Sequence, residues 1–243
     1  MDQTRDRRRM KAILALAAAL AFALGPTLAP GFEGFRPEQY PIAQENPPVV
    51  PAGYAFAIWG LIYPWLLASA AYGLFMRADD AGWDATRAPL IVSLAVGATW
   101  LAVAMQSAAQ ATVLIWVMLA GALAALFPAA RAGADRWWLV HPLSVYAGWL
   151  TAASWVALGL AGGGYLGGAP ALWAAFALAG ALATTVAVQR RLPGAPGYGL
   201  AVIWALAGLV VRNAASMPLI AVLAGAGILG LGLLLWRHRR VGS

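Results

Sequence analysis

Two apolar stretches of the chain carry aromatic side chains where a plain lipid-facing helix would carry leucine or valine. In "PAGYAFAIWGLIYPWLLASAAYGLF", Phe56, Trp59 and Tyr63 follow one another at i, i+3 and i+7 and share one helical face. A Trp N–H or Tyr O–H in hydrocarbon needs a hydrogen-bond partner or costs free energy. We therefore expect these rings to point into a helical bundle, either as the wall of a ligand pocket or as core packing.

The stretch "WWLVHPLSVYAGWLTAASWVALGL" combines rings with hydroxyl groups. Tyr146 and Trp149 are i, i+3 neighbours, and Thr151 shares a face with Ser154 and Trp155. Hydroxyl residues in membrane helices commonly bond their own backbone or a neighbouring helix. A wall of rings with a few hydroxyls would also suit a flat, mostly apolar ligand with a few polar edges.

Arg212 is the most unusual charge, because it lies within an apolar segment, about 15 residues or roughly 22 Å of helix from a start near Gly197. An ionisable residue within a membrane segment is a candidate for function, and an arginine could pair with a ligand carboxylate such as a propionate. The alternative is a side chain that reaches the lipid headgroups or pairs with Glu33, Glu38 or Glu45.

The sequence contains no catalytic constellation. It has no cysteine, which excludes disulfides and thiolate sites, and no carboxylate lies inside an apolar segment. The histidines, His141 and His238, are far apart and do not predict a metal site; a haem-ligand role for His141 is the alternative to an interfacial side chain. We expect a protein that is not an enzyme and has no cofactor, with a tetrapyrrole considered only as a ligand.

The elements that must position these residues are membrane helices. The chain has 243 residues, of which 62% are hydrophobic and 10% charged, whereas soluble domains are about half apolar and a quarter charged. Apolar stretches close to the roughly 20 residues needed to cross a bilayer recur along it. We predict an all-α, polytopic integral membrane bundle of about eight transmembrane helices, at 11–30, 52–76, 88–107, 111–130, 138–161, 170–188, 197–214 and 217–236.

The basic residues support this count. With a cytoplasmic N-terminus, all of the 16 Lys and Arg residues except Arg36 and Arg212 fall at inside ends, as the positive-inside rule predicts. Both termini are therefore expected in the cytoplasm, with the chain in a bacterial-type inner membrane. The net charge of +7 then reflects orientation rather than nucleic-acid binding. The first segment also has the form of a secretory signal peptide, but it lacks a clear cleavage site, which favours a retained helix.

The longest external connection is the loop at residues 31–51. It contains five prolines, Pro37, Pro41, Pro47, Pro48 and Pro51, which favour an extended, semi-rigid run. A loop of this length is either a cap over the outer mouth of the bundle or a spacer.

Three segments carry a resemblance to a known family. "PAGYAFAIWGLIY" resembles the start of the second helix of the tryptophan-rich sensory protein family, also called TspO/MBR or translocator protein, with Tyr54 in place of the first Trp. "HPLSVYAGWLTAAS" resembles its fifth helix, with Ser154 where Asn is usual. "GATWLAVA" resembles its third helix, with Trp100 kept and Gly97 in place of Asn. The matching residues of the second and fifth helices are Pro51, Phe56, Trp59, Tyr63, Pro142, Tyr146, Trp149 and Thr151.

The resemblance implies a TspO-like five-helix bundle over residues 1–165 and leaves residues 166–243 as a three-helix membrane extension with a basic cytoplasmic tail. It also implies a membrane receptor or carrier for a flat hydrophobic ligand, porphyrin or sterol-like, in a pocket between the second and fifth helices. The loss of two asparagines removes polar contacts that could orient a ligand. The ligand-binding residues would be Tyr54, Phe56, Trp59, Tyr63, Trp100, Tyr146, Trp149 and Ser154, to which the charge pattern adds Arg212.

Two other functions stay open from the sequence. A transporter or channel for a small solute, completed by the last three helices, predicts a continuous polar lining. A structural or assembly subunit predicts aromatic residues that only pack. The expected partners are a hydrophobic small molecule and the lipid bilayer, without nucleic acid, and a homodimer is left open.

Overall fold

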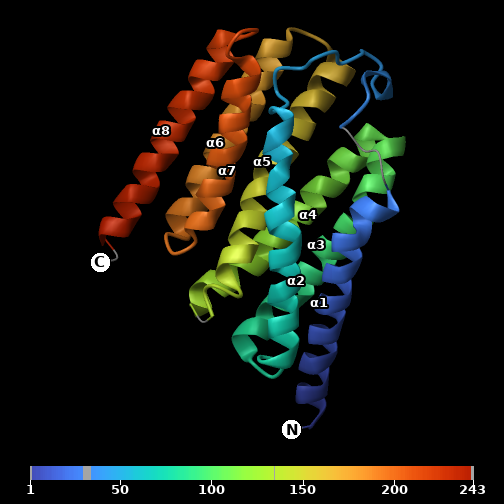
Figure 1. Cartoon of the computed structure of the whole chain (residues 1–243), viewed down its shortest axis with the longest axis vertical. Coiled ribbons are helices and arrows are strands. Elements are labelled where there is room, and N and C mark those ends of the chain that lie inside the picture. The colour runs from blue at the N-terminus through green and yellow to red at the C-terminus, as the bar shows by residue number, and fades with distance from the viewer. Residues whose placement is uncertain (1, 30–33, 134, 242–243) are drawn as a thin grey trace.

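The computed structural model describes residues 2–29, 34–133 and 135–241, and this part of the chain forms an all-helical bundle without strands (Figure 1). The α-helices are α1 (Asp2–Leu28), α2 (Trp59–Phe75), α3 (Ala81–Gln106), α4 (Ala108–Ala132), α5 (Val140–Leu166), α6 (Pro170–Arg191), α7 (Pro196–Asn213) and α8 (Pro218–Val241). Two short 3₁₀ helices, η1 (Pro37–Gln39) and η2 (Gly53–Ile58), lie between α1 and α2.

The predicted helical membrane fold is confirmed, and each predicted segment corresponds to one helix. Seven of the described helices are long and apolar enough to cross a membrane. The eighth, α7, has 18 residues and falls outside this set. One boundary differs from the prediction, because residues 53–58 form the 3₁₀ helix η2 and α2 begins only at Trp59.

The bundle has two distinct ends, because successive helices run in opposite directions (Figure 1). We call one the terminal end; both chain termini and the α2–α3, α4–α5 and α6–α7 connections lie there. The opposite, loop end holds residues 34–52 and the α3–α4, α5–α6 and α7–α8 connections. Positions with Lys or Arg lie toward the terminal end, except Arg36 and Arg212 at the loop end. The basic residues are thus concentrated at one end of the bundle.

Local sequence sets where the helices begin. Asp80 caps α3 by accepting the backbone N–H of Trp83 at 3.0 Å, and Ser107 caps α4 by accepting that of Gln110 at 3.3 Å. Because Ser107 alone separates α3 from α4, these helices form a tight antiparallel hairpin. The first turns of α6, α7 and α8 carry proline, whose missing N–H costs nothing there: Pro170, Pro196 and Pro218.

Helix α5 is the centre of the bundle. In its most apolar stretch 72% of the residues are buried, against 28–39% in the other six candidate spans. It packs against α4, α6 and α7, and also touches α2. Gly148 permits the close approach of α7, because a Cβ atom there would collide with the backbone carbonyl of Tyr198. Every neighbour of α5 can therefore contribute to a site built on it.

Residues 34–52, which we call the roof segment, cross the loop end of the bundle (Figure 1). The side chain of Gln39 donates a hydrogen bond to the carbonyl of Ala104 near the end of α3, at 2.8 Å. The backbone N–H of Ile42 donates to the carbonyl of Gly164 near the end of α5, at 3.0 Å. The first half of the roof segment is therefore fixed to two helices.

The second half of the roof segment is fixed to α7. The backbone N–H of Ala52 donates to the carbonyl of Gly208 at 3.0 Å, and the side-chain amide of Asn213 donates to the carbonyl of Pro48 at 2.9 Å. With both halves bonded to helices, the segment covers the bundle as a cap. Residues 31–33 of the predicted external loop lie outside the described residues.

Candidate ligand-binding site

An apolar cavity of about 120 Å³ lies beneath the roof segment. The roof segment lines it with Phe35 and with the run from Pro48 to Pro51, and η2 adds the ring of Phe56. The remaining wall comes mainly from α5, α6 and α7. Its principal residues are Trp149, Ala152, Ala153, Trp155, Val156 and Ala157 on α5, Ala174, Ala177 and Ala181 on α6, and Val202, Ala205 and Leu206 on α7.

Alanine is the reason why space remains between these three helices. Larger residues at the same positions would interdigitate, as buried side chains in close-packed protein interiors do. Here Ala153 and Ala157 of α5 face the same cavity as Ala177 of α6 and Ala205 of α7. The rings of Trp149 and Trp155 on α5 and of Phe56 on η2 complete this part of the wall.

Indole nitrogens are the only polar side-chain atoms of the described cavity wall. The Nε1–H of Trp100 donates to the carbonyl of Ala111 at 2.8 Å, and that of Trp155 donates to the hydroxyl of Thr184 at 3.1 Å. The Nε1–H of Trp149 is buried and has no hydrogen-bond partner among the described residues. The wall therefore offers apolar surface and aromatic rings.

Three of the predicted ligand-binding residues line this cavity: Phe56, Trp100 and Trp149. The ring of Phe56 meets that of Trp149 edge-on, with centroids 5.7 Å apart and planes at 86°. The second and fifth predicted helices thus do meet at a cavity, through η2 rather than through α2 itself.

Trp59 and Tyr63 lie next to the cavity and do not line it. Their rings stack on each other with centroids 4.9 Å apart, and Phe22 of α1 packs edge-on against both, at 5.8 and 5.0 Å. Phe22 also meets Tyr146 of α5 at 5.6 Å. We call Phe22, Trp59, Tyr63 and Tyr146 the packed ring cluster. For three of the predicted site residues, core packing is therefore the observed arrangement.

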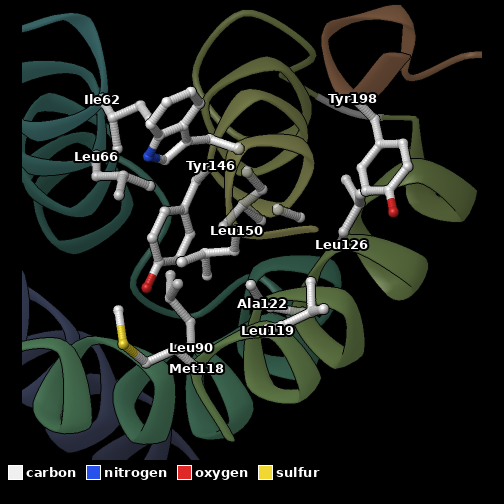
Figure 2. Packing of buried hydrophobic residues seen from close by; sticks show 14 of the residues in the cluster. Ile62, Leu66, Leu90, Met118, Leu119, Ala122, Leu126, Tyr146, Leu150 and Tyr198 are labelled. Atoms are coloured by element: carbon white, nitrogen blue, oxygen red, sulfur yellow. The ribbon is translucent and has the colours of Figure 1, made fainter. Parts of the chain in front are cut away.

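Tyr146 lies entirely inside the bundle. Figure 2 shows its ring reaching from α5 past Ile62 and Leu66 of α2 toward Leu90 and Met118 of α3 and α4. All five side chains belong to one buried core.

The hydroxyl of Tyr146 is satisfied within the core. It lies 2.9 Å from the hydroxyl of Ser93, which donates in turn to the carbonyl of Met118 at 2.7 Å. This chain ties α5 to α3 and α4 and leaves no polar edge of Tyr146 for a ligand.

Tyr54 and Ser154 also lie outside the cavity wall. Tyr54 is half-exposed and packs edge-on against Trp204 of α7 with centroids 5.6 Å apart. Ser154 is fully buried, and its hydroxyl donates to the carbonyl of Ile115 on α4 at 3.4 Å. Tyr54 therefore lies on the surface, and Ser154 links α5 to α4.

Arg212 is an exposed side chain at the loop end. Its guanidinium donates to the side-chain carbonyl of Asn46 in the roof segment at 3.1 Å. It does not line the cavity, and no ion pair joins it to Glu38 or Glu45 in the described part of the chain. Glu33, the third predicted partner, lies outside the described residues. Arg212 therefore holds the roof segment by a hydrogen bond to a neutral amide.

Several cavity residues escaped the sequence analysis. Phe35 belongs to a loop whose contacts local sequence does not encode, and the alanines of α6 and α7 resemble those of any membrane helix. Trp155 was noticed as a deep ring but was not assigned to the site. Its spacing from Trp149 gave no such signal, because residues six apart on a helix lie on different faces.

The described residues contain no cluster of three or more His, Asp or Glu side chains that could hold a metal ion. His141 lies beside Trp137 at the terminal end, with ring centroids 6.2 Å apart. The haem-ligand role and the interfacial position of His141 both stay predictions.

The terminal end contains an ionic network well away from the cavity. Asp135 accepts hydrogen bonds from the Arg77 guanidinium at 2.7 and 3.1 Å and from the Trp83 indole at 3.0 Å. The Arg77 bond holds the pKa of Asp135 below its ordinary value, and the Trp83 bond acts in the same direction. This network closes the turns between α2 and α3 and between α4 and α5.

Fold and site together define a class: a polytopic helical membrane protein whose bundle contains an apolar, ring-lined cavity beneath the roof segment. The chain belongs to the family of TSPO-like proteins, whose model matches residues 12–236. The predicted family resemblance is thereby confirmed, and membership indicates a membrane protein that binds or transports a ligand.

The family match extends beyond the five helices on which the resemblance rested. It runs through α6, α7 and most of α8, and two of these helices form much of the cavity wall. The division of the chain near residue 165 stays a prediction. No curated protein and no solved structure matches the chain.

Proposed function

We propose that the chain is a membrane receptor or carrier that binds a flat hydrophobic ligand, of the tetrapyrrole or sterol-like class, in the cavity beneath the roof segment. This proposal rests on the lining of the cavity. The described wall residues are aliphatic and aromatic, and none of them carries a charged side chain. Ligand sites in proteins are mostly apolar and carry few polar groups. A channel for a polar solute would need a polar path, which this wall does not supply.

The size of the cavity bears on how a ligand enters. Pockets for drug-sized ligands hold about 300–1,000 Å³, and a cavity of roughly 150 Å³ holds benzene. At about 120 Å³ this cavity corresponds to a single ring. A sterol or tetrapyrrole is larger than this space, so its binding requires the surrounding wall residues or the roof segment to move.

Titration of the purified, detergent-solubilised chain tests the proposal. Protoporphyrin and the fluorescent sterol dehydroergosterol both accept excitation energy from tryptophan, so binding near Trp149 will quench the protein fluorescence saturably. Ala153→Leu places three more carbon atoms in the cavity and should weaken binding at least tenfold.

Val211→Leu is the matched control, because Val211 is an exposed side chain of α7 outside the cavity wall, and it should leave the affinity unchanged. Quenching that does not saturate with either ligand would overturn the proposed function. If Ala153→Leu and the control bind the ligand with equal affinity, the ligand binds at a site other than this cavity.

We further propose that the role is non-catalytic and that the terminal end faces the cytoplasm of a bacterial-type inner membrane. The gathering of basic positions at that end supports the orientation. A cysteine introduced at Ser216, in the α7–α8 turn of a cysteine-free chain, should react with an impermeant maleimide in intact cells. Labelling only after lysis would reverse the orientation. The homodimer stays a prediction.

A further inference from the structure

A second and larger pocket lies at the terminal end of the bundle. It is an open groove of about 780 Å³ between the start of α1 and the connection from α2 to α3, which lie side by side there (Figure 1). We call it the terminal groove. Its charged lining residues are Arg5 and Arg9 of α1, Arg77, Asp79 and Asp80 of the α2–α3 connection, and Asp135 of the α4–α5 connection.

The lining of the terminal groove changes from charged to apolar along α1. Arg5, Arg9 and Ile13 follow one another at intervals of four residues, so they share one helical face and lie about 6 Å apart along the axis. On the other side of the groove, Phe75 and Met76 at the end of α2 are exposed apolar side chains. Apolar side chains of a membrane protein face hydrocarbon, and arginines reach the headgroup level. The groove therefore has the polarity of a phospholipid.

The charges of the terminal groove balance. Three arginines and three aspartates line it, so the formal charges of the described lining sum to zero. Two pairs are already formed within it: Arg5 lies 2.9 Å from Asp79, and Arg77 lies 2.7 Å from Asp135. A lining of this kind does not favour a ligand with a net negative charge.

Arg9 and Asp80 are the lining charges left over from these pairs. Arg9 is exposed and makes no hydrogen bond or ion pair with any residue that the structure describes. Asp80 uses Oδ1 to accept the backbone N–H of Trp83 at 3.0 Å, and its Oδ2 accepts no hydrogen bond within the described part of the chain. The groove thus offers one guanidinium and one carboxylate oxygen to a ligand that carries both an anion and an N–H cation.

We propose that the terminal groove binds the zwitterionic headgroup of phosphatidylethanolamine, with the phosphate on Arg9, the ammonium group on Asp80 and acyl chains along Ile13 and Phe75. Arginine donates paired N–H groups to phosphate oxygens, and a primary ammonium group donates to a carboxylate. The quaternary ammonium of phosphatidylcholine has no N–H, and phosphatidylglycerol has no cation. This site is separate from the cavity beneath the roof segment and does not depend on the proposed function.

Native mass spectrometry of the full chain in detergent can measure the affinities for these three lipids with identical acyl chains. Phosphatidylethanolamine should bind about 3- to 10-fold more tightly than either of the others, as one additional hydrogen bond provides. Glycerophosphoethanolamine carries the same headgroup without acyl chains and should not displace the lipid at equal concentration. Displacement would make a soluble headgroup the ligand and overturn the assignment to a membrane lipid.

Arg9→Gln removes the cation from the groove and should weaken phosphatidylethanolamine binding at least about tenfold, because the bonds to phosphate are charge-assisted. Arg7→Gln is the matched control: Arg7 is an exposed side chain of the same helix outside the groove lining, and its loss should leave the affinity unchanged. Both side chains are exposed, so neither change should lower the unfolding midpoint.

Asp80→Asn tests the ammonium contact separately. Asparagine caps a helix about as well as aspartate, so α3 keeps its first turn, while the carboxylate that accepts from the ammonium group is lost. The variant should bind phosphatidylethanolamine and phosphatidylcholine equally.

Three results would overturn the proposal. One is equal affinity of the unmodified chain for the three lipids, and another is tighter binding of phosphatidylglycerol, which would mean that the terminal groove selects anions. The third is an equal loss of affinity in Arg9→Gln and Arg7→Gln, which would place the lipid outside the groove.

Discussion

The packed ring cluster and the cavity are neighbouring regions built from the same kinds of side chain, and only one of them leaves space. In the cluster, Phe22 of α1 fills the gap between the helices and meets three rings within 5.8 Å. Gly97 of α3 leaves room for the Phe22 ring, because a Cβ atom at this position would collide with it. At the cavity, Trp149 and Phe56 share the wall with alanines such as Ala177 and Ala205, and space remains between them.

The difference shows that the residue opposite a ring decides whether the ring packs or lines a cavity. Glycine opposite Phe22 lets the ring of Phe22 pack against other rings, whereas the small alanine side chains of three helices leave space at the cavity. Aromatic richness alone therefore does not mark a ligand site. The two regions should respond differently to substitution, and three experiments test this.

The largest effect is expected from Phe22→Ala. Removing a ring from a filled core costs about 3–5 kcal/mol in stability, and the loss should appear as a lower unfolding midpoint in mixed detergent micelles. Phe75→Ala is the control for the same chemical change at a side chain that is 75% exposed, and it should cost no more than about 0.5 kcal/mol. Equal losses for the two variants would mean that the cluster is not filled.

A smaller effect is expected from Tyr146→Phe, which keeps the ring and removes the hydroxyl bonded to Ser93. The loss should be about 1 kcal/mol, because Ser93 keeps its bond to the Met118 carbonyl. Tyr54→Phe makes the same change on a half-exposed ring and should leave the midpoint unchanged. Saturation binding to Tyr146→Phe should match that of the unmodified chain; weaker binding would bring Tyr146 back into the ligand site.

The smallest effect is expected from Asp135→Asn, and its dependence on pH distinguishes the terminal end from the cavity. Asp135, held by Arg77, has a pKa below its ordinary 3.8, so it binds its proton less readily in the folded chain than in the unfolded one. Its stabilising contribution is full above pH 3.8 and is lost as the pH falls through the lower folded value. Asp135→Asn should therefore be less stable than the unmodified chain at neutral pH, by less than Tyr146→Phe, and the gap should close below pH 3.8.

Ligand affinity is the second quantity to measure over the same pH range. Because no described side chain of the cavity wall titrates, the affinity for an uncharged ligand should stay constant between pH 7 and pH 4. A gap in unfolding midpoints that persists in acid would contradict the assignment to Asp135. A pH-dependent affinity would contradict the separation of the two regions.

Most of the fold could be predicted from the sequence, because hydropathy and basic residues report directly on the bilayer. Eight segments became eight helices, and the basic positions gathered at one end. The start of α2 was wrong by seven residues, since the 3₁₀ form of η2 depends on contacts such as the bond from Trp204 to the carbonyl of Ala55, a residue pair 149 positions apart.

The candidate site could be predicted only in part, for a related reason. The spacing of Phe56, Trp59 and Tyr63 on one face was sound, yet whether each ring meets space depends on Phe22, which comes from another helix. The alanines of α6 and α7 leave space because their side chains are small. In the sequence they cannot be told from the alanines of any other hydrophobic segment. Of the predicted rings, Phe56, Trp100 and Trp149 line the cavity.

The bond between Ala52 and Gly208 has a consequence for biosynthesis. Membrane helices are made in order from the N-terminus at about 5–20 residues per second, so the partner of Ala52 is synthesised roughly 8 to 31 s after Ala52 itself. The Asn213 amide, which bonds the Pro48 carbonyl, arrives later still. The nascent chain therefore passes first through an intermediate of α1 to α6 in which only the first half of the roof segment has its helical partners. The second half of the roof segment gains its partners only when α7 enters the bilayer.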